Sequence, residues 1–274
     1  MGTRHEDKNE EVESLHEIAF LVNSVNRFAV LENLTDGEHS RHVLAERLDV
    51  SRVTIARILD DLEDRQWISQ HGQIAEITSL GAWVVEEVSE LQQMMIVERK
   101  LRSVIRWFPD EGFGFHIGCL KDADITRVTE ADATSPIDRL VRQLDHAEHV
   151  QAFSFAITGQ FLNACWEFVI EENHTFEWVF TTDVLEVLTS NEVMRQQSRE
   201  MLESGRATFI HYDDTIPYVV ILTEITANLR LADESGAPSA LIQTEQEEVR
   251  AWAESMFETY RAEGTPVENE LFAL

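Results

Sequence analysis

Arginine and small hydroxyl side chains gather at the start of two short helical patterns between residues 40 and 64. Arginine can donate two hydrogen bonds to guanine O6 and N7 or contact a phosphate, and a serine at a helix N-terminus suits a phosphate. The side chains that could contact DNA are Ser40, Arg41, Ser51, Arg52, Thr54, Arg57, His71 and Gln73. A solvated helix surface could carry the same residue types, but arginine is scarce in this chain, so its placement favours a functional role.

Two helices and a hairpin must position these side chains. Ser40 is a plausible N-cap for a helix through Leu48, and Ser51 for a second helix through about Asp64. Two short helices joined by such a turn form a helix-turn-helix, whose second helix enters the major groove. The side chains expected inside on the second helix are Val53, Ile55, Leu59 and Leu62. Alternating residues 67–70 and 73–77 about His71-Gly72 predict a β-hairpin, or wing.

Residues 40–81 resemble the winged-helix domains of archaeal and bacterial regulators, whose pattern LAERLxVSRxTIxRxLxxLExxxWI they carry almost throughout. The resemblance implies a DNA-binding domain over residues 14–80, in which Ser40 and Arg41 face the backbone and the wing tip reaches the minor groove. Asp49 stands where glycine is usual, and aspartate tolerates the left-handed backbone of such a turn. Some winged helices bind proteins instead, but those tend to lack exposed arginines on the second helix.

The composition is that of a globular chain. Its 274 residues favour two domains, and 43% hydrophobic residues suffice for a core in each. The sequence has no apolar run long enough to span a bilayer and no signal peptide, which predicts a cytoplasmic protein. Cys119 and Cys165 form no CxxC pair, so we expect two small apolar side chains.

The net charge of −29 is unusual, with 51 acidic against 22 basic residues. Molar salt would screen the resulting self-repulsion, and this acidic, lysine-poor composition resembles that of haloarchaeal proteins. An acidic surface that binds a protein is the alternative, but it would need a local cluster, and here the acidic residues are spread along the chain. Because an acidic protein is a poor default candidate for binding nucleic acid, DNA binding must depend on the local pattern.

A long helical pattern separates the N-terminal domain from the rest. Residues 1–13 are mostly charged and are expected to be disordered, and one helix is expected from Leu15 to Asp36-Gly37. Residues 81–109 place apolar side chains three and four apart, which predicts a connector helix. Its apolar surface favours a homodimer, with burial inside one chain as the alternative.

Residues 110–274 alternate between strand and helix patterns. This order predicts an α/β domain with a mainly parallel sheet, so that the fold class is α/β overall: an α+β winged helix, a connector helix and an α/β effector or dimerisation domain.

Three segments of this domain, 136–140, 203–206 and 254–260, resemble the effector domain of haloarchaeal winged-helix regulators, named after a methanogen regulator of filament formation. That family is related to sugar-sensing archaeal regulators and to phospholipase D-like folds. The HxK(x4)D pattern of the latter is absent, because Lys121 is the only lysine here and no histidine lies two residues before it. We therefore expect no enzyme.

A small polar or anionic metabolite would bind at the carboxyl ends of parallel strands, near helix N-termini. The candidates are Ser135, Arg139, Thr158, Gln160, Thr182 and His211. For any one hydroxyl, simple N-capping is the more frequent role.

Metal and cofactor chemistry find little support. His39 with His42, and His146 with His149, each lack a third ligand, and no GxGxxG, P-loop or GxSxG motif occurs. The sequence thus predicts a dimeric, sequence-specific regulator that binds promoter DNA without metal or cofactor. A scaffold that uses its winged helix to bind proteins is the alternative.

Overall fold

The computed structural model describes residues 3–109, 112–232 and 237–273. The chain divides into two compact units, residues 1–93 and 94–274. Helix α5 (Ser79–Leu101) begins in the N-terminal unit and ends in the C-terminal unit. Within the described ranges, no helix combines the length and apolar character needed to cross a lipid bilayer.

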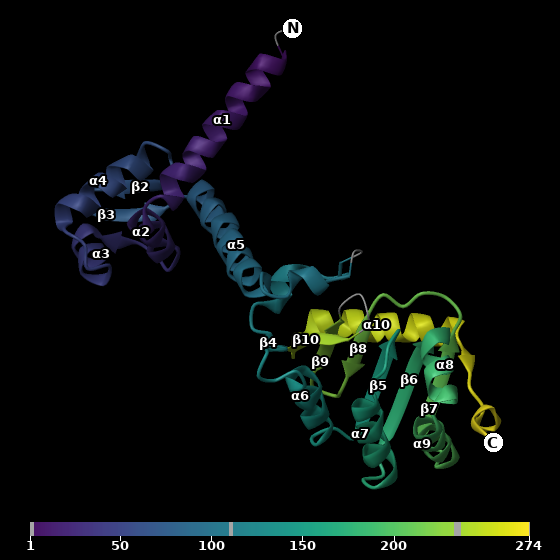
Figure 1. Cartoon of the computed structure of the whole chain (residues 1–274). Coiled ribbons are helices and arrows are strands. Elements are labelled where there is room, and N and C mark those ends of the chain that lie inside the picture. Colours follow the sequence, from purple (N-terminus) through teal and green to yellow (C-terminus); the bar gives the residue numbers. More distant parts are fainter. Residues whose placement is uncertain (1–2, 110–111, 233–236, 274) are drawn as a thin grey trace. The chain divides into compact units, whose positions relative to one another are not determined.

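The N-terminal unit combines four helices with a small antiparallel sheet (Figure 1). The helices before α5 are α1 (Thr3–Val22), α2 (Val25–Thr35), α3 (Arg41–Arg47) and α4 (Arg52–Glu63). The strands β1 (His39–Ser40), β2 (Ile68–His71) and β3 (Ile74–Ile77) lie in the order β1-β3-β2. Leu31 of α2, Leu44 of α3 and Leu59 of α4 are fully buried and form one core.

The first helices differ from the expectation in two respects. Residues 3–13, expected to be disordered, belong to α1. The single helix expected from Leu15 to Asp36 is broken at Asn23-Ser24, where Ser24 has an extended backbone with φ of −138°. Its apolar periodicity continues across the break, which is why the sequence pattern alone did not reveal it.

The C-terminal unit is built on one eight-stranded sheet in the order β11-β7-β6-β5-β8-β9-β10-β4. The strands are β4 (Asp124–Arg127), β5 (His149–Ser154), β6 (Thr175–Thr181), β7 (Ala207–Tyr212), β8 (Val219–Leu222), β9 (Ala227–Ala232), β10 (Pro238–Thr244) and β11 (Thr265–Pro266). The helices are α6 (Ser135–Leu144), α7 (Gly159–Ile170), α8 (Thr182–Ser190), α9 (Glu192–Glu203) and α10 (Glu247–Glu263), with short 3₁₀ turns at Ile105–Trp107, Ile117–Leu120 and Asn269–Phe272.

The expectation of a mainly parallel sheet is wrong, because the sheet is mixed. Only the β5–β6 and β6–β7 pairs are parallel, and the other five pairs are antiparallel. Parallel neighbours need a crossover, which α7, α8 and α9 supply between β5, β6 and β7. Strands β8 and β9 are joined by residues 223–226 alone, a link too short for a crossover, so they pair as a hairpin.

Helices cover both faces of this sheet (Figure 1). Buried side chains of α6, α7, α8 and α9 pack on one face and form the first core of the unit. Helix α10 packs on the other face with the end of α5, where Val97, Leu101 and Val104 are buried. Each side of the sheet therefore has its own apolar layer.

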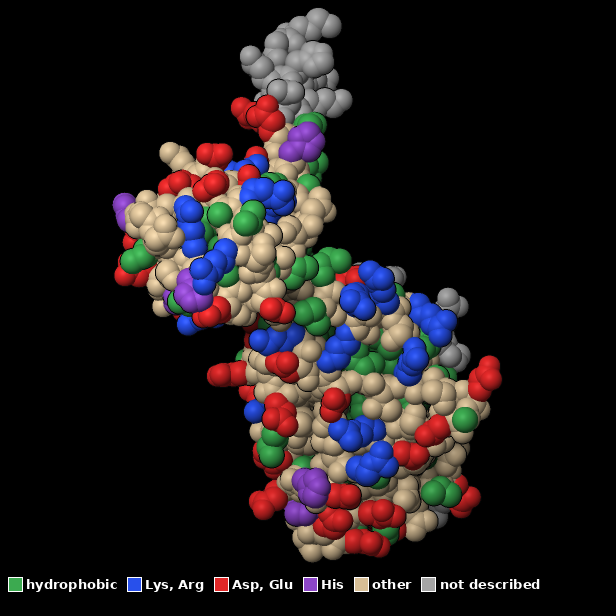
Figure 2. All heavy atoms as spheres, turned by 90° about the vertical axis from the view of Figure 1, so that its left-hand side faces the viewer, with side chains coloured by type: hydrophobic (Ala, Val, Ile, Leu, Met, Phe, Trp, Pro, Cys, Tyr) green, Lys and Arg blue, Asp and Glu red, His purple; other side chains and the backbone are tan. Residues whose placement is uncertain are grey.

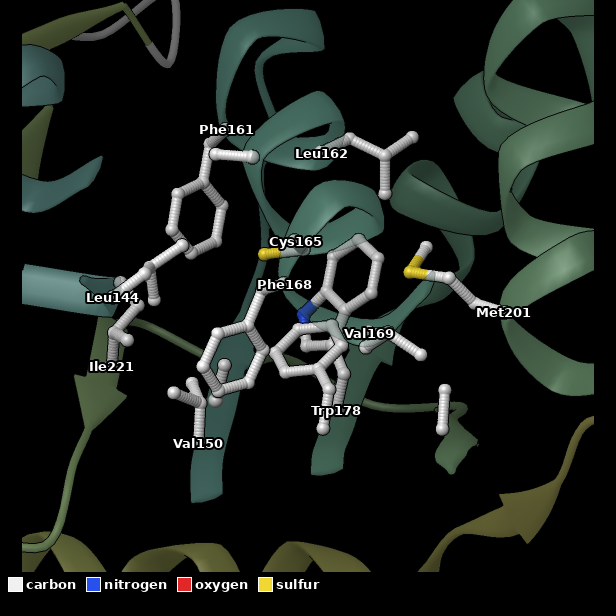
Figure 3. Close-up of a cluster of buried hydrophobic side chains, with 14 of the residues drawn as sticks. Leu144, Val150, Phe161, Leu162, Cys165, Phe168, Val169, Trp178, Met201 and Ile221 are labelled. Carbon is white, nitrogen blue, oxygen red and sulfur yellow. The ribbon is translucent and has the colours of Figure 1, made fainter. Parts of the chain in front are cut away.

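Aromatic side chains fill the core under α7. Trp178 donates from Nε1 to Ser154 Oγ at 2.9 Å, and both side chains are buried. Cys165 lies among Phe161, Phe168 and Trp178 (Figure 3). Burial raises the pKa of the Cys165 thiol far above its ordinary value, so this sulfur packs as an apolar atom.

The two thiols are therefore expected to differ in reactivity. Thiolate is the reacting form, and Cys165 is buried and held protonated, whereas Cys119 is half-exposed with a less strongly raised pKa caused first by burial. Iodoacetamide should label Cys119 slowly in the folded protein and both cysteines after unfolding, as read by mass spectrometry of peptides. Rapid labelling of Cys165 in the folded chain would contradict this packing.

Candidate nucleic-acid interface

Serine side chains fix the starts of α3 and α4. Ser40 Oγ accepts a hydrogen bond from the Val43 amide at 3.3 Å. Ser51 Oγ accepts one from the Thr54 amide at 3.1 Å and lies 2.9 Å from Thr54 Oγ1. The hydroxyls proposed to contact DNA therefore also satisfy amides that the first helical turn leaves unpaired.

The turn between the two helices depends on Asp49. Its φ is +51°, in the left-handed region where glycine is the usual residue. The following Val50 amide donates to Ala45 O at 3.0 Å and closes the turn. Asp49 thus adopts the left-handed backbone that this turn requires, and the turn sets the direction in which α4 follows α3.

The outer face of α4 carries two arginines and one valine. The expectation that Val53 is buried is wrong, because its side chain is 82% exposed, and Ile58 is buried in its place. At about 100° of rotation per residue, Val53 lies between Arg52 and Arg57 on an arc of about 140°. Ile55, Ile58 and Leu59 face the core. The sequence analysis missed Val53 as a candidate contact, and helical phase was the signal that could have found it.

The two arginines differ in how much the fold restrains them. Arg52 donates from Nη2 to His42 Nδ1 at 3.1 Å, and His42 Nε2 lies 3.5 Å from Glu46 Oε1. Arg57 is exposed and has no hydrogen bond or ion pair within the described part of the chain. Its guanidinium is therefore available to an external partner.

Arg41 is used inside the unit. It donates from Nη2 to Gln70 Oε1 at 2.7 Å and lies 3.9 Å from Asp60 Oδ1. Gln70 is also bonded to Glu63. These contacts tie the start of α3 to α4 and β2, so Arg41 positions the helices, whatever it contacts outside.

The hairpin tip is short. His71 pairs with Ile74 across a turn of two residues, and Gly72 has a φ of +68°. His71 is exposed with Nε2 3.4 Å from Glu76 Oε1, and Gln73 is exposed at the tip. Both side chains face solvent, as a contact with DNA requires.

Charge is unevenly placed along this region. Residues 39–58 hold four arginines and two acidic residues in a chain of net charge −29. The acidic residues of α4 (Asp60, Asp61 and Glu63) all lie in its second half. Figure 2 shows basic side chains on the face of the N-terminal unit turned to the viewer. The start of α4 therefore carries the positive charge.

The six predicted ligand-binding residues divide into separate places in the C-terminal unit. Thr182 Oγ1 lies 2.9 Å from His211 Nε2, so these two are in contact. Thr158 caps α7 through the Phe161 amide at 3.3 Å, and Ser135 donates to Arg127 O at 3.0 Å. Thr158 thus has the N-capping role of the alternative expectation, whereas Ser135 bonds to the backbone of β4.

Gln160 and Arg139 engage acidic partners. Gln160 donates to Asp138 Oδ1 at 2.6 Å, and hydrogen bonds from Thr134 and Gln160 lower the pKa of Asp138. Arg139 lies 3.3 Å from Asp124 Oδ2 and donates to Gln243 Oε1 at 3.1 Å, beside an acidic cavity of 480 Å³. An acidic lining disfavours an anion there. No group of three or more metal-ligating side chains occurs in the ranges that the structure describes.

Substitution of Asp49 tests the turn directly. Asp49→Gly should leave the free energy of unfolding unchanged or raise it slightly, because glycine adopts a φ of +51° without strain. Asp49→Val should lower it by about 1–2 kcal/mol, since a β-branched residue is disfavoured there. Denaturant unfolding in high salt measures both, and equal stability of the two variants would contradict a left-handed Asp49.

Two family models match separate parts of the chain. Residues 15–100 match the HVO_A0261 N-terminal domain, and residues 133–263 match the middle domain of the methanogenesis regulatory protein FilR1. Among curated proteins, none matches the chain.

Several solved structures resemble the chain at a distance. TrmBL2, an archaeal chromatin protein, is 11% identical, with 86% of this chain and 91% of that one covered and a TM-score of 0.42. The regulator BldR from Sulfolobus solfataricus is 22% identical over 38% of this chain and 88% of its own, with a TM-score of 0.28. Nuc from Salmonella typhimurium, a phospholipase D family member, is 10% identical over 53% and 99%, at 0.41.

At TM-scores this low, these structures carry no argument about function. The family matches are more informative about function. The N-terminal part of the chain matches the HVO_A0261 N-terminal domain, and the C-terminal part matches a domain of a regulatory protein.

Proposed function

We propose that the chain is a sequence-specific, DNA-binding transcription regulator whose N-terminal unit acts as a winged helix-turn-helix. The match of residues 133–263 to a domain of a regulatory protein supports a regulatory role. The order of α2, α3, α4 and the β2–β3 hairpin is the order of a winged helix. In this proposal the first half of α4 enters the major groove of a promoter.

The observation that carries the proposal is the outer face of α4. Arg57 is exposed and unpaired within the described residues of an acidic chain, and Arg52 is held only by His42. An unpaired guanidinium can donate to guanine O6 and N7, and exposed Val53 can contact a thymine methyl group. Together they offer both polar and apolar contacts to base edges.

The scaffold alternative would need a broad apolar surface on the same helices. Across residues 41–64, all of which the structure describes, Val53 is the one large apolar side chain that is strongly exposed. A single valine between arginines fits a groove better than a protein interface.

The setting of this function is part of the proposal. The acidic composition fits the cytoplasm of a halophilic archaeon, where molar salt screens the self-repulsion of the chain. We propose that the chain is not an enzyme. We also propose that a small polar or anionic metabolite binds to the C-terminal unit.

Arginine substitution on α4 tests DNA binding. Genome-wide binding in a high-salt host should give promoter peaks, which an Arg52→Ala/Arg57→Ala variant loses. On the operator so identified, Arg57→Ala alone should weaken binding by about 1–3 kcal/mol, because one bidentate base contact is lost. Fluorescence anisotropy in molar KCl measures this.

Arg142→Ala is the matched control, since Arg142 is an exposed arginine of the C-terminal unit. It should bind the operator as the wild type does. If the wild-type protein is folded but gives no promoter peaks, the DNA-binding proposal is refuted and a protein partner becomes the better explanation.

We propose further that the regulator is a homodimer, because helix-turn-helix proteins generally read two half-sites. Helix α1 exposes Leu15, Ile18 and Val22, spaced three and four residues apart, and α5 exposes Trp83 at 65%. A second copy that covers these side chains would remove them from water.

Negative charges introduced on the exposed apolar face of α1 should dissociate the dimer. Leu15→Glu/Ile18→Glu should give a monomer by light scattering in molar KCl, with unchanged helix content by circular dichroism. Glu10→Gln/Glu13→Gln, on the same helix, is the control and should leave the mass unchanged. A monomeric wild-type protein, or a dimeric double-glutamate variant, would refute this interface.

A further inference from the structure

A cavity of 810 Å³ lies within the C-terminal unit at one edge of its sheet. Phe155 follows the end of β5, Tyr218 precedes β8, and Arg230 lies near the end of β9. The register pairs Ser154 with Val219 and Val219 with Arg230, so these three strand ends lie side by side. The cavity has the volume usual for sites that bind small molecules.

Arg230 is a buried cation with no partner among the described residues. The residue is 6% exposed, and its Nε and Nη2 atoms are buried without a hydrogen bond in the part of the chain that the structure describes. It also has no ion pair among those residues. Burial lowers the pKa of Arg230 to about 10, which still leaves the side chain charged at neutral pH. An uncompensated buried charge is strongly unfavourable unless something else neutralises it.

The surroundings of Arg230 hold its side chain in place. Under α6 and α7 it contacts a small apolar space lined by Ile137, Leu140 and Phe161. Arg230 lines both this apolar space and the large cavity. A charged group fixed in this way is preorganised to bind an anion with little loss of side-chain entropy.

The rest of the described cavity lining is mainly aromatic and aliphatic and includes no acidic residue. Its described walls include Trp107, Phe108, Phe113, Phe155 and Tyr218, and no aspartate or glutamate, in a chain with 51 acidic residues. Phe113 stacks on Tyr218 with ring centroids 5.6 Å apart. The second cation of the lining, Arg106, is exposed and lies over the Trp107 ring at 4.3 Å.

We propose that this cavity binds an organic carboxylate with an apolar body, whose carboxylate pairs with Arg230. A guanidinium donates charge-assisted hydrogen bonds to a carboxylate, and the aromatic walls remove the body of the ligand from water. One buried cation matches one negative charge, which favours a monocarboxylate over a doubly charged phosphate. The site differs from the residues that the sequence analysis selected, since none of those six lines it.

The proposal deepens the metabolite response given above, and in that respect it depends on the proposed function. The binding site itself does not, because the C-terminal unit contains it entirely. The 3₁₀ turn that carries Arg106 and Trp107 follows the end of α5 along the chain. A ligand in the cavity would therefore contact the segment that continues from the N-terminal unit.

Thermal unfolding of the full chain in molar KCl tests the site. Phenylacetate and carboxylates of graded length, such as butyrate and octanoate, should raise Tm as their concentration increases, because a ligand that binds only the folded state stabilises it. Phenylacetamide, which has the same body without the charge, and inorganic phosphate should not raise it. Calorimetric titration should give one site per chain.

Two arginine variants make the test specific. Arg230→Met should abolish the response to carboxylates and raise the Tm of the ligand-free protein, because it replaces an unpaired buried charge with an apolar side chain of similar length. Arg139→Met is the matched control, since Arg139 is paired with Asp124 in the same unit, and it should keep the wild-type response.

The proposal is overturned if ligand-free Arg230→Met is less stable than the wild type, because the guanidinium would then be stabilised by the protein itself. It is also overturned if no carboxylate raises Tm, if Arg230→Met responds as the wild type does, or if phosphate alone is effective. Operator binding with and without phenylacetate is measured separately. A ligand that binds without effect on DNA would refute the metabolite response and leave the site intact.

Discussion

Eight arginines of the described residues form ion pairs with acidic neighbours, in a chain where acidic residues outnumber basic ones by 51 to 22. Arg27, Arg41, Arg65 and Arg139 all form such ion pairs, and with them they connect helices and strands within each unit. Exposed pairs of this kind add little stability, and molar salt screens them further. Cohesion in both units therefore depends on the apolar layers. An arginine without an acidic neighbour keeps its positive charge uncompensated.

Arg57 and Arg230 are two such residues, and they differ in environment. Arg57 is exposed on α4 and is solvated until a partner arrives. Arg230 is buried and lines the cavity. The first arrangement suits a surface that must bind and release a large anionic partner, since little desolvation is needed. The second suits a small ligand that supplies the missing charge inside the fold. In both units an arginine with no ion pair among the described residues would bind an anionic partner, on the surface in one case and inside the fold in the other.

Local patterns predicted the elements of the site better than their assembly. The serine caps, the turn at Asp49 and the two α4 arginines follow from residue type and spacing, because hydrogen bonds within one turn form them. Val53 was expected in the core because its side chain is apolar. Its position around the helix axis instead places it on the exposed face of α4. The mixed sheet was missed because strand patterns carry no direction. The link of four residues at 223–226 was the available signal, since so short a link cannot make a crossover. Arg230 lies within the apolar strand ANLRLA, and only the tertiary structure shows that its Nε and Nη2 atoms have no hydrogen-bond partner among the described residues.

The two-residue turn at Gly72-Gln73 has a consequence for how such a domain can diverge. Closing a longer loop costs only slightly more chain entropy than closing a short one. The hairpin tip can therefore accept inserted residues while the ladder between β2 and β3, and the core that fixes α4, stay as they are. A gene duplicate could lengthen this hairpin and change the surface that its tip presents, yet keep the position of α4. Diversification among paralogues would then be concentrated at the tip, where the fold constrains the chain least.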